Sequence, residues 1–76
     1  LYKLENFSED KIYLERAIKI MPDDPIVNDH FADCLWMNNK KIQARYYWKY
    51  VLTLEDTEKE LRQKIENKLL FGLEKS

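Results

Sequence analysis

The chain has 76 residues, of which 45% are hydrophobic and 36% are charged, and its formal net charge is −1. This length suits one small domain, and the composition is that of an ordinary soluble protein rather than of a disordered chain. The near-neutral charge argues against a nucleic-acid-binding surface, which needs a surplus of Lys and Arg, and no apolar run is long enough to cross a membrane. A single Gly favours an all-α fold over a turn-rich β fold.

Helical periodicity dominates the first half of the chain. Apolar residues in the segment 8–21 recur at three- and four-residue steps, which predicts one amphipathic helix. Pro22 ends this helix, and Asp24 followed by Pro25 predicts the start of a second. A carboxylate can cap the first free amides, and Pro loses no hydrogen bond at the first helical position. The second helix is expected to reach about Asn38.

The second half continues this pattern. The stretch "NNKK", residues 38–41, is the only polar break before a third helix, so a tight antiparallel turn is predicted. The third helix is expected to end near Leu54. Thr57 and Glu60 have the spacing of a capping box and predict a fourth helix, which ends near Gly72.

The chain also repeats its own pattern at a distance of 34 residues. The paired positions keep their apolar character across both helices and the turn. The pairs are Tyr13 with Tyr47, Leu14 with Trp48, Ile18 with Leu52, Val27 with Leu61, Phe31 with Ile65 and Leu35 with Leu69. A period of about 34 residues in helix–turn–helix units is that of the tetratricopeptide repeat.

The segment 25–56 resembles one full tetratricopeptide repeat. Ala32 and Ala44 stand at the small positions of the motif, and Trp48 stands at its aromatic position. Three positions depart from the motif, where Asn28 replaces the signature tryptophan, Asn39 the turn glycine and Asp56 the closing proline. The same stretch is similar to a pattern in bacterial, notably alphaproteobacterial, repeat proteins.

The resemblance implies an α-solenoid of antiparallel helix pairs. Residues 1–22 would form the second half of a repeat, residues 25–56 a full repeat, and residues 57–73 a C-terminal capping helix with a charged outer face. This is fewer than the roughly three repeats that stability usually requires, and the chain begins at Leu1 rather than Met. We therefore expect the C-terminal end of a longer array, or a unit that completes itself by self-association.

In this family the first helix of each pair lines a concave groove. The resemblance therefore implies a partner-binding surface formed by Ile26, Asp29, Asp33, Trp36 and Met37. Asp29 and Asp33 lie one helical turn apart, and paired carboxylates beside an indole suit a peptide that carries Lys or Arg. The alternative is that both are exposed aspartates that simply solvate a helix.

His30 and Cys34 raise the question of a metal site or a catalytic dyad. They are the only His and the only Cys in the chain, whereas zinc requires three or four ligands. Cys34 falls on the apolar stripe and is predicted to be buried. Without an orienting third group or a Gly-rich phosphate loop, we expect neither a metal, nor a cofactor, nor enzyme activity.

The sequence thus predicts a scaffold that binds a protein or peptide ligand, with no nucleic acid partner and no membrane span. The alternative is a structural unit that forms homo-oligomers through the open face of the first helix, with Ile12, Tyr13 and the nearby Tyr2. Both hypotheses concern a soluble protein, and the sequence leaves its compartment open between cytoplasm and periplasm.

Overall fold

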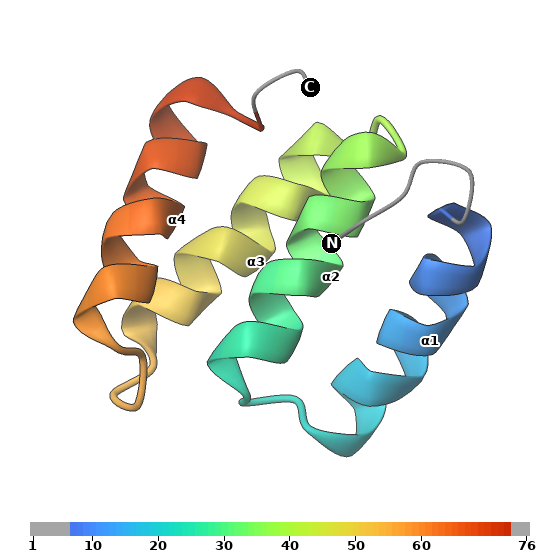
Figure 1. Cartoon of the computed structure of the whole chain (residues 1–76), viewed down its shortest axis with the longest axis horizontal. Coiled ribbons are helices and arrows are strands. Elements are labelled where there is room, and N and C mark those ends of the chain that lie inside the picture. Colours follow the sequence, from blue (N-terminus) through green and yellow to red (C-terminus); the bar gives the residue numbers. More distant parts are fainter. Residues whose placement is uncertain (1–6, 74–76) are drawn as a thin grey trace.

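The computed structural model describes residues 7–73, with side chains from residue 11 onward. This part of the chain forms four helices and no strand: α1 (Phe7–Ile20), α2 (Pro25–Met37), α3 (Lys41–Thr53) and α4 (Lys59–Phe71). The helices lie in chain order, and successive helices run in opposite directions (Figure 1). The all-α prediction is confirmed for the described residues, and the packing of each helix on its sequence neighbours is consistent with a helical repeat. Tyr2, predicted to lie near the open face of the first helix, falls outside the described residues.

Asp24 fixes the junction between α1 and α2, as the sequence predicts. Its carboxylate accepts hydrogen bonds from the backbone amides of Ile26 and Val27, at 2.9 and 3.0 Å. It therefore satisfies two of the amides that the first turn of a helix leaves unpaired. Asn28 is buried and donates from its side-chain amide to the carbonyls of Pro22 and Asp24. The Asn28 side chain thus ties the loop between α1 and α2 to the first turn of α2.

The hydrophobic core lies mainly between α2 and α3. Ala32 and Ala44 are fully buried, as expected for small residues where helices pack closely. The ring of Trp48 is buried in the same core cluster. The rings of Phe31 and Tyr47 meet edge to face, with centroids 5.0 Å apart. The other buried apolar side chains of the described part are Leu14, Cys34, Leu35, Val51 and Ile65.

The link between α3 and α4 differs from the prediction. The capping box of Thr57 and Glu60 is wrong, because α4 begins at Lys59 after Glu58, and no side chain caps its free amides. The Thr57 hydroxyl donates instead to the carbonyl of Val51, at 2.7 Å. Thr57 therefore closes the end of α3 rather than the start of α4.

Two arginines anchor α4 to α3 through main-chain carbonyls. Near the start of α4, Arg62 donates to the carbonyls of Leu52 and Leu54, each at 2.8 Å. Toward its other end, Arg45 of α3 donates to the carbonyl of Leu69 at 2.7 Å. These are charge-assisted bonds to carbonyls at helix ends, which helical hydrogen bonding leaves unpaired.

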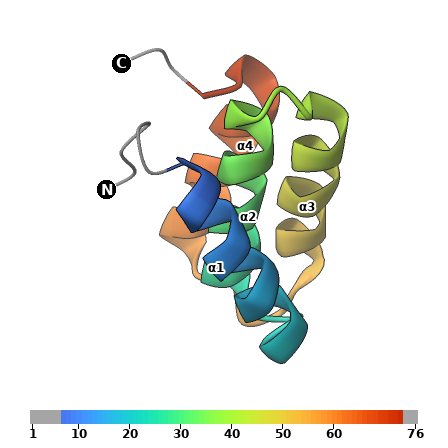
Figure 2. The ribbon, with the colours of Figure 1, turned by 90° about the vertical axis from the view of Figure 1, so that its right-hand side faces the viewer.

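In side view, α3 lies to one side of the other helices (Figure 2). It packs on α2 and α4, and its outward side chains Ile42, Tyr46 and Lys49 are exposed. Among residues 7–73, no helix combines the length and the apolar character needed to cross a membrane.

Candidate functional site

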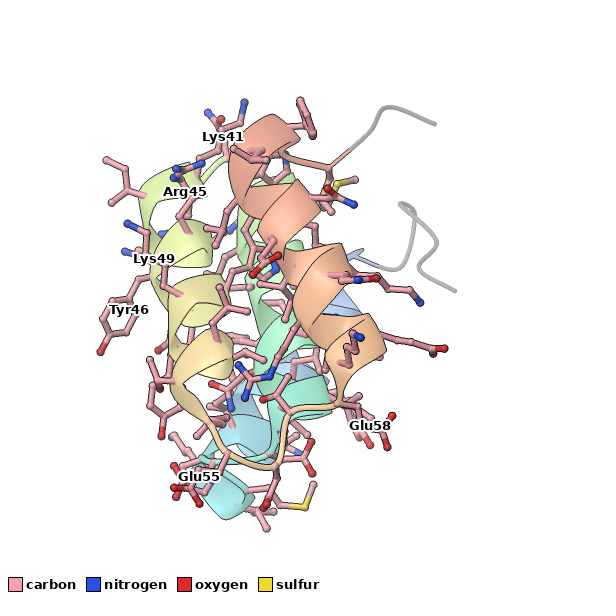
Figure 3. The ribbon with its side chains drawn as sticks, turned by 90° about the vertical axis from the view of Figure 1, so that its left-hand side faces the viewer. Lys41, Arg45, Tyr46, Lys49, Glu55 and Glu58 are labelled. Carbon is pink, nitrogen blue, oxygen red and sulfur yellow. The ribbon has the colours of Figure 1, made fainter. Side chains whose placement is uncertain are left out.

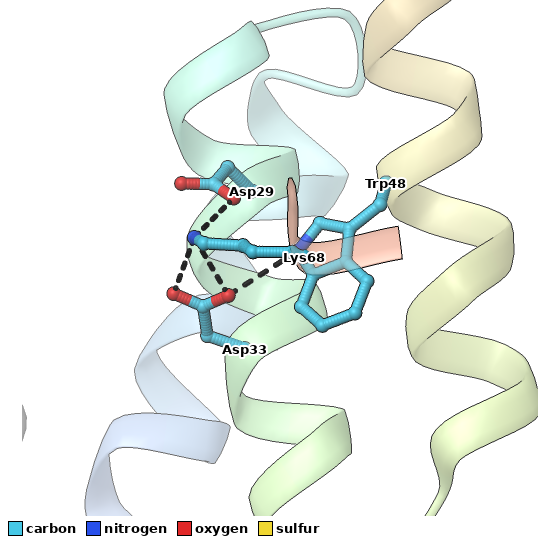
Figure 4. Close-up of polar contacts among 4 residues, drawn as sticks. All are labelled: Asp29, Asp33, Trp48 and Lys68. Carbon is cyan, nitrogen blue, oxygen red and sulfur yellow. Dashed lines mark hydrogen bonds and ion pairs between the residues drawn. The ribbon is translucent and has the colours of Figure 1, made fainter. Parts of the chain in front are cut away.

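Asp29 and Asp33 of α2 converge on Lys68 of α4 (Figure 4). The Lys68 Nζ lies 2.9 Å from Oδ1 of Asp29 and 3.0 and 3.1 Å from the two carboxylate oxygens of Asp33. The two aspartates are one helical turn apart, so a single ammonium group on the neighbouring helix reaches both. We call this group the ionic junction, formed by Asp29, Asp33, Lys68 and the adjoining Trp48.

The ionic junction corrects the prediction of open carboxylates. Asp29 and Asp33 are only 5% and 9% exposed, so the alternative of two exposed, solvated aspartates is wrong. The Nε1–H of Trp48 donates to Oδ1 of Asp33 at 3.2 Å, and the Lys68 Nζ lies 5.8 Å from the Trp48 ring centroid. The cation expected from a ligand is thus supplied by Lys68 of the chain itself, and the indole beside the aspartates is that of Trp48 rather than of Trp36.

Burial and the two like charges govern the proton affinities in this junction. Burial of Asp33, together with the nearby charge of Asp29, raises the pKa of Asp33 from 3.8 to about 6, although Lys68 and the Trp48 hydrogen bond act in the opposite direction. Burial alone would lower the pKa of Lys68. The hydrogen bond with Asp29 and the charges of both aspartates outweigh it and raise the pKa of Lys68 above its ordinary value. Lys68 therefore stays charged, while Asp33 can take up a proton at mildly acidic pH.

An open groove with a volume of about 530 Å³ lies between α2 and α4, and Asp29, Asp33 and Lys68 of the ionic junction are part of its lining. Its apolar surface comes from Pro25, Ile26 and Leu61, of which Ile26 is 59% exposed. The polar residues that line it are Asp24, Asp29, His30, Asp33, Asp56, Glu58, Glu60, Lys64 and Lys68. Six carboxylates thus face two lysines, which makes the groove strongly negative. We call it the α2–α4 groove, and its exposed acids Asp56, Glu58 and Glu60 the acidic rim.

Trp36 and Met37 do not line this groove, although the sequence grouped them with Ile26. Trp36 packs on the ring of Trp48, with centroids 5.5 Å apart, and the Lys41 Nζ lies 4.9 Å from its centroid. A Cβ atom built on Gly72 would lie 2.3 Å from a carbon of the Trp36 ring. Met37 is exposed at the same end of α2, away from the groove lining. Of the five predicted residues, the groove brings together Ile26, Asp29 and Asp33.

Sequence reasoning missed Lys68 and the acidic rim. A signal for Lys68 exists, because it lies three residues after Ile65 and seven after Leu61, on the apolar stripe of its helix. A lysine on such a stripe is almost always paired when it is buried. The acidic rim belongs to the stretch "EDTEKE". The sequence shows the negative charge of this stretch, but it does not show which helix the stretch faces.

The chemical groups of the site can bind and orient cations, and they offer two ways to do so. The junction holds the partly buried ammonium group of Lys68 between two buried carboxylates, whereas the rim presents exposed carboxylates to water. Within residues 7–73, His, Cys, Asp and Glu form no group of three or more that could hold a metal ion. Cys34 is fully buried, as predicted.

Comparison of the chain with models of protein families, with curated proteins and with solved structures found no match.

Proposed function

We propose that this protein is a tetratricopeptide-like interaction module that binds a basic peptide or protein segment in the α2–α4 groove, without catalysis. The observation that carries the proposal is the charge of the groove. Six carboxylates and two lysines line it, whereas the whole chain has a net charge of only −1. Concave, partly apolar surfaces with one sign of charge concentrate ligands of the opposite sign.

The ligand's cations would meet the acidic rim rather than the ionic junction. Asp29 and Asp33 are buried and already pair with Lys68, so their carboxylates are engaged inside the protein. Asp56, Glu58 and Glu60 are exposed and line the same groove. A Lys or Arg side chain could place its head group at this rim, since such side chains pair with carboxylates.

The floor of the groove suits the rest of such a side chain. Pro25, Ile26 and Leu61 supply apolar surface next to the rim. The alkyl stems of Lys and Arg favour apolar contact while their charged ends remain at the surface. A segment that alternates basic and apolar residues therefore fits the groove better than a purely polar one.

Fluorescence anisotropy with a labelled peptide of alternating Arg and Leu tests this function. We expect binding to the full chain that weakens several-fold from low to high ionic strength, because the rim charges are exposed and screened by salt. The double variant Glu58→Lys, Glu60→Lys should lose most of this binding. A peptide with Glu in place of Arg should not bind.

The matched control reverses two exposed acids outside the groove, Glu15 and Glu66, to Lys. It changes the net charge by the same amount and should bind the Arg peptide nearly as well as the parent. Equal losses in both double variants would mean that total charge, not the groove, governs binding. Charge reversal at Asp29 and Asp33 would be a poor test, because it places like charges around Lys68 and acts on folding.

The second candidate function is self-association through α1. This helix packs on α2 and leaves Ile12, Tyr13 and Ile20 exposed, with Ile20 at 78%. Several exposed apolar side chains on one short helix are typical of a contact surface. If this function is correct, the double variant Tyr13→Gln, Ile20→Gln should lower the mass measured at high concentration, and the groove variants should not.

A further inference from the structure

The outward face of α3 combines positive charge with exposed apolar groups. The helix contains no Asp or Glu, and Lys41, Arg45 and Lys49 follow one another at four-residue steps. Figure 3 shows these three residues in a row along α3, with Tyr46 pointing outward beside them. Ile42, next to Lys41, is 86% exposed, and Tyr46 is 66% exposed. We call these five residues the α3 stripe.

Part of the α3 stripe has a role within the fold, and part of it is available. Arg45 donates to the Leu69 carbonyl, and the Lys41 ammonium lies over Trp36. Lys49 is exposed and makes no ion pair with another described side chain. The exposed pair Ile42 and Tyr46 adds apolar surface that α2 and α4 do not cover. The stripe therefore matches a partner surface that is both acidic and partly apolar.

The chain itself carries such a surface in the α2–α4 groove. The acidic rim of the groove is complementary in charge to the lysines of the stripe. Its apolar residues Pro25, Ile26 and Leu61 could contact Ile42 and Tyr46 of another copy. The net charge of −1 conceals this separation of the two signs onto different parts of the surface. Complementary patches of this kind steer association and fix its register.

We propose that the α3 stripe of one copy docks in the α2–α4 groove of a second copy. This inference rests on the proposed function, because it uses the same groove and names a second copy of the chain as its basic ligand. The two sides of the contact consist of different residues, so the contact is heterologous. A docked pair still offers one free stripe on one copy and one free groove on the other, so further copies can add head to tail. A soluble basic peptide would compete with this assembly.

The test is sedimentation velocity on the full chain over a range of concentrations at low ionic strength. The average mass of the parent should rise with concentration, and added salt should reverse the rise. The stripe variant Ile42→Gln, Lys49→Gln and the groove variant Glu58→Lys, Glu60→Lys should each remain monomeric. Neither pair is buried, so both variants should fold, and circular dichroism is the check.

Mixing the two variants gives the sharpest result. The groove variant retains an intact stripe and the stripe variant retains an intact groove, so an equimolar mixture should form dimers with one copy of each. Neither copy in that dimer has a second working surface, and nothing larger should appear. A control variant, Lys19→Gln, Ile20→Gln, removes one exposed cation and one exposed apolar residue from α1 and should assemble like the parent.

Three outcomes would overturn the inference: a parent that stays monomeric at every concentration, an assembly unchanged by the stripe variant, or an assembly lost in the α1 control. Anisotropy with the Arg peptide, on the same samples, separates this failure from that of the proposed function. A monomeric parent that still binds the peptide would refute head-to-tail docking alone. A parent that neither assembles nor binds the peptide would refute both.

Discussion

Toward α3, helix α2 contributes Phe31 to an apolar interface with Tyr47, whereas toward α4 it contributes Asp29 and Asp33 to ion pairs with the partly buried Lys68. The apolar interface excludes water and gains free energy from packed surface. The ionic junction must first remove three charged groups from water, and its Coulomb energy only offsets this cost. The first interface thus supplies stability. The second makes the position of α4, and the shape of the groove beside it, dependent on charge and pH.

Trp48→Ala should have the largest effect, because Trp48 belongs to both interfaces. The substitution leaves a cavity in the core and removes the Nε1–H that Asp33 accepts. We expect the free energy of unfolding to fall by about 4 kcal/mol. Chemical denaturation measures this loss. Trp48→Phe retains an aromatic ring but not the N–H, and a loss as large as that of alanine would show that the hydrogen bond, not packing, dominates.

Lys68→Met isolates the ionic junction. It leaves Asp29 and Asp33 buried, adjacent and unpaired, which should lower the free energy of unfolding by about 3 kcal/mol. Adding Asp33→Asn to this variant removes one of the two charges and should recover part of the loss. The absence of any recovery in the double variant would contradict the assigned repulsion between the two carboxylates.

The pH dependence of stability should come from Asp33. Its pKa in the folded state, about 6, lies above the ordinary value of 3.8, so the folded protein binds more protons between these two pH values. The stabilisation from this group is therefore complete below about pH 4 and is lost as the pH rises through about 6. It amounts to about 3 kcal/mol at most. Urea denaturation at several pH values, compared between the parent and Asp33→Asn, measures it. If the free energy of unfolding changed with pH equally in both proteins, the pH dependence would come from a group other than Asp33.

Gly72→Ala should have a smaller but specific effect at the end of α4. Gly72 has a φ of +72°, and an added Cβ would lie 2.3 Å from the Trp36 ring. We expect a loss of about 1 to 2 kcal/mol, from left-handed backbone strain and displacement of the indole. Thermal unfolding measures the loss. The double variant Trp36→Ala, Gly72→Ala removes the clash, so the glycine substitution should cost less on that background.

The sequence predicted the helices and the first helix junction, although the local capping box of Thr57 and Glu60 was wrong. Asp24 with Pro25 specified a helix start, and the small residues Ala32 and Ala44 specified a close helix contact. The groove depended instead on the rotation of α4 about its axis. Periodicity places Lys68 on the apolar stripe of this helix, but it does not show that the partners of Lys68 are two aspartates more than 30 residues away.

The prediction of open aspartates failed for the same reason. A pair of carboxylates on a helix has the same spacing whether it faces water or an internal cation. Only the packing of α4 on the rest of the chain distinguished the two, and it leaves the acidic rim, rather than Asp29 and Asp33, as exposed negative charge in the groove.

A nuclear magnetic resonance titration of the isotope-labelled full chain with the Arg and Leu peptide tests peptide binding in the α2–α4 groove most directly. We expect the amide signals of Ile26, His30, Glu60 and Leu61 to shift progressively. The outward residues of α1 should not shift, and those of α3 should shift only as far as the peptide displaces the α3 stripe of a second copy. Unshifted groove signals, or shifts centred on α1, would contradict the assignment of the α2–α4 groove as the binding site.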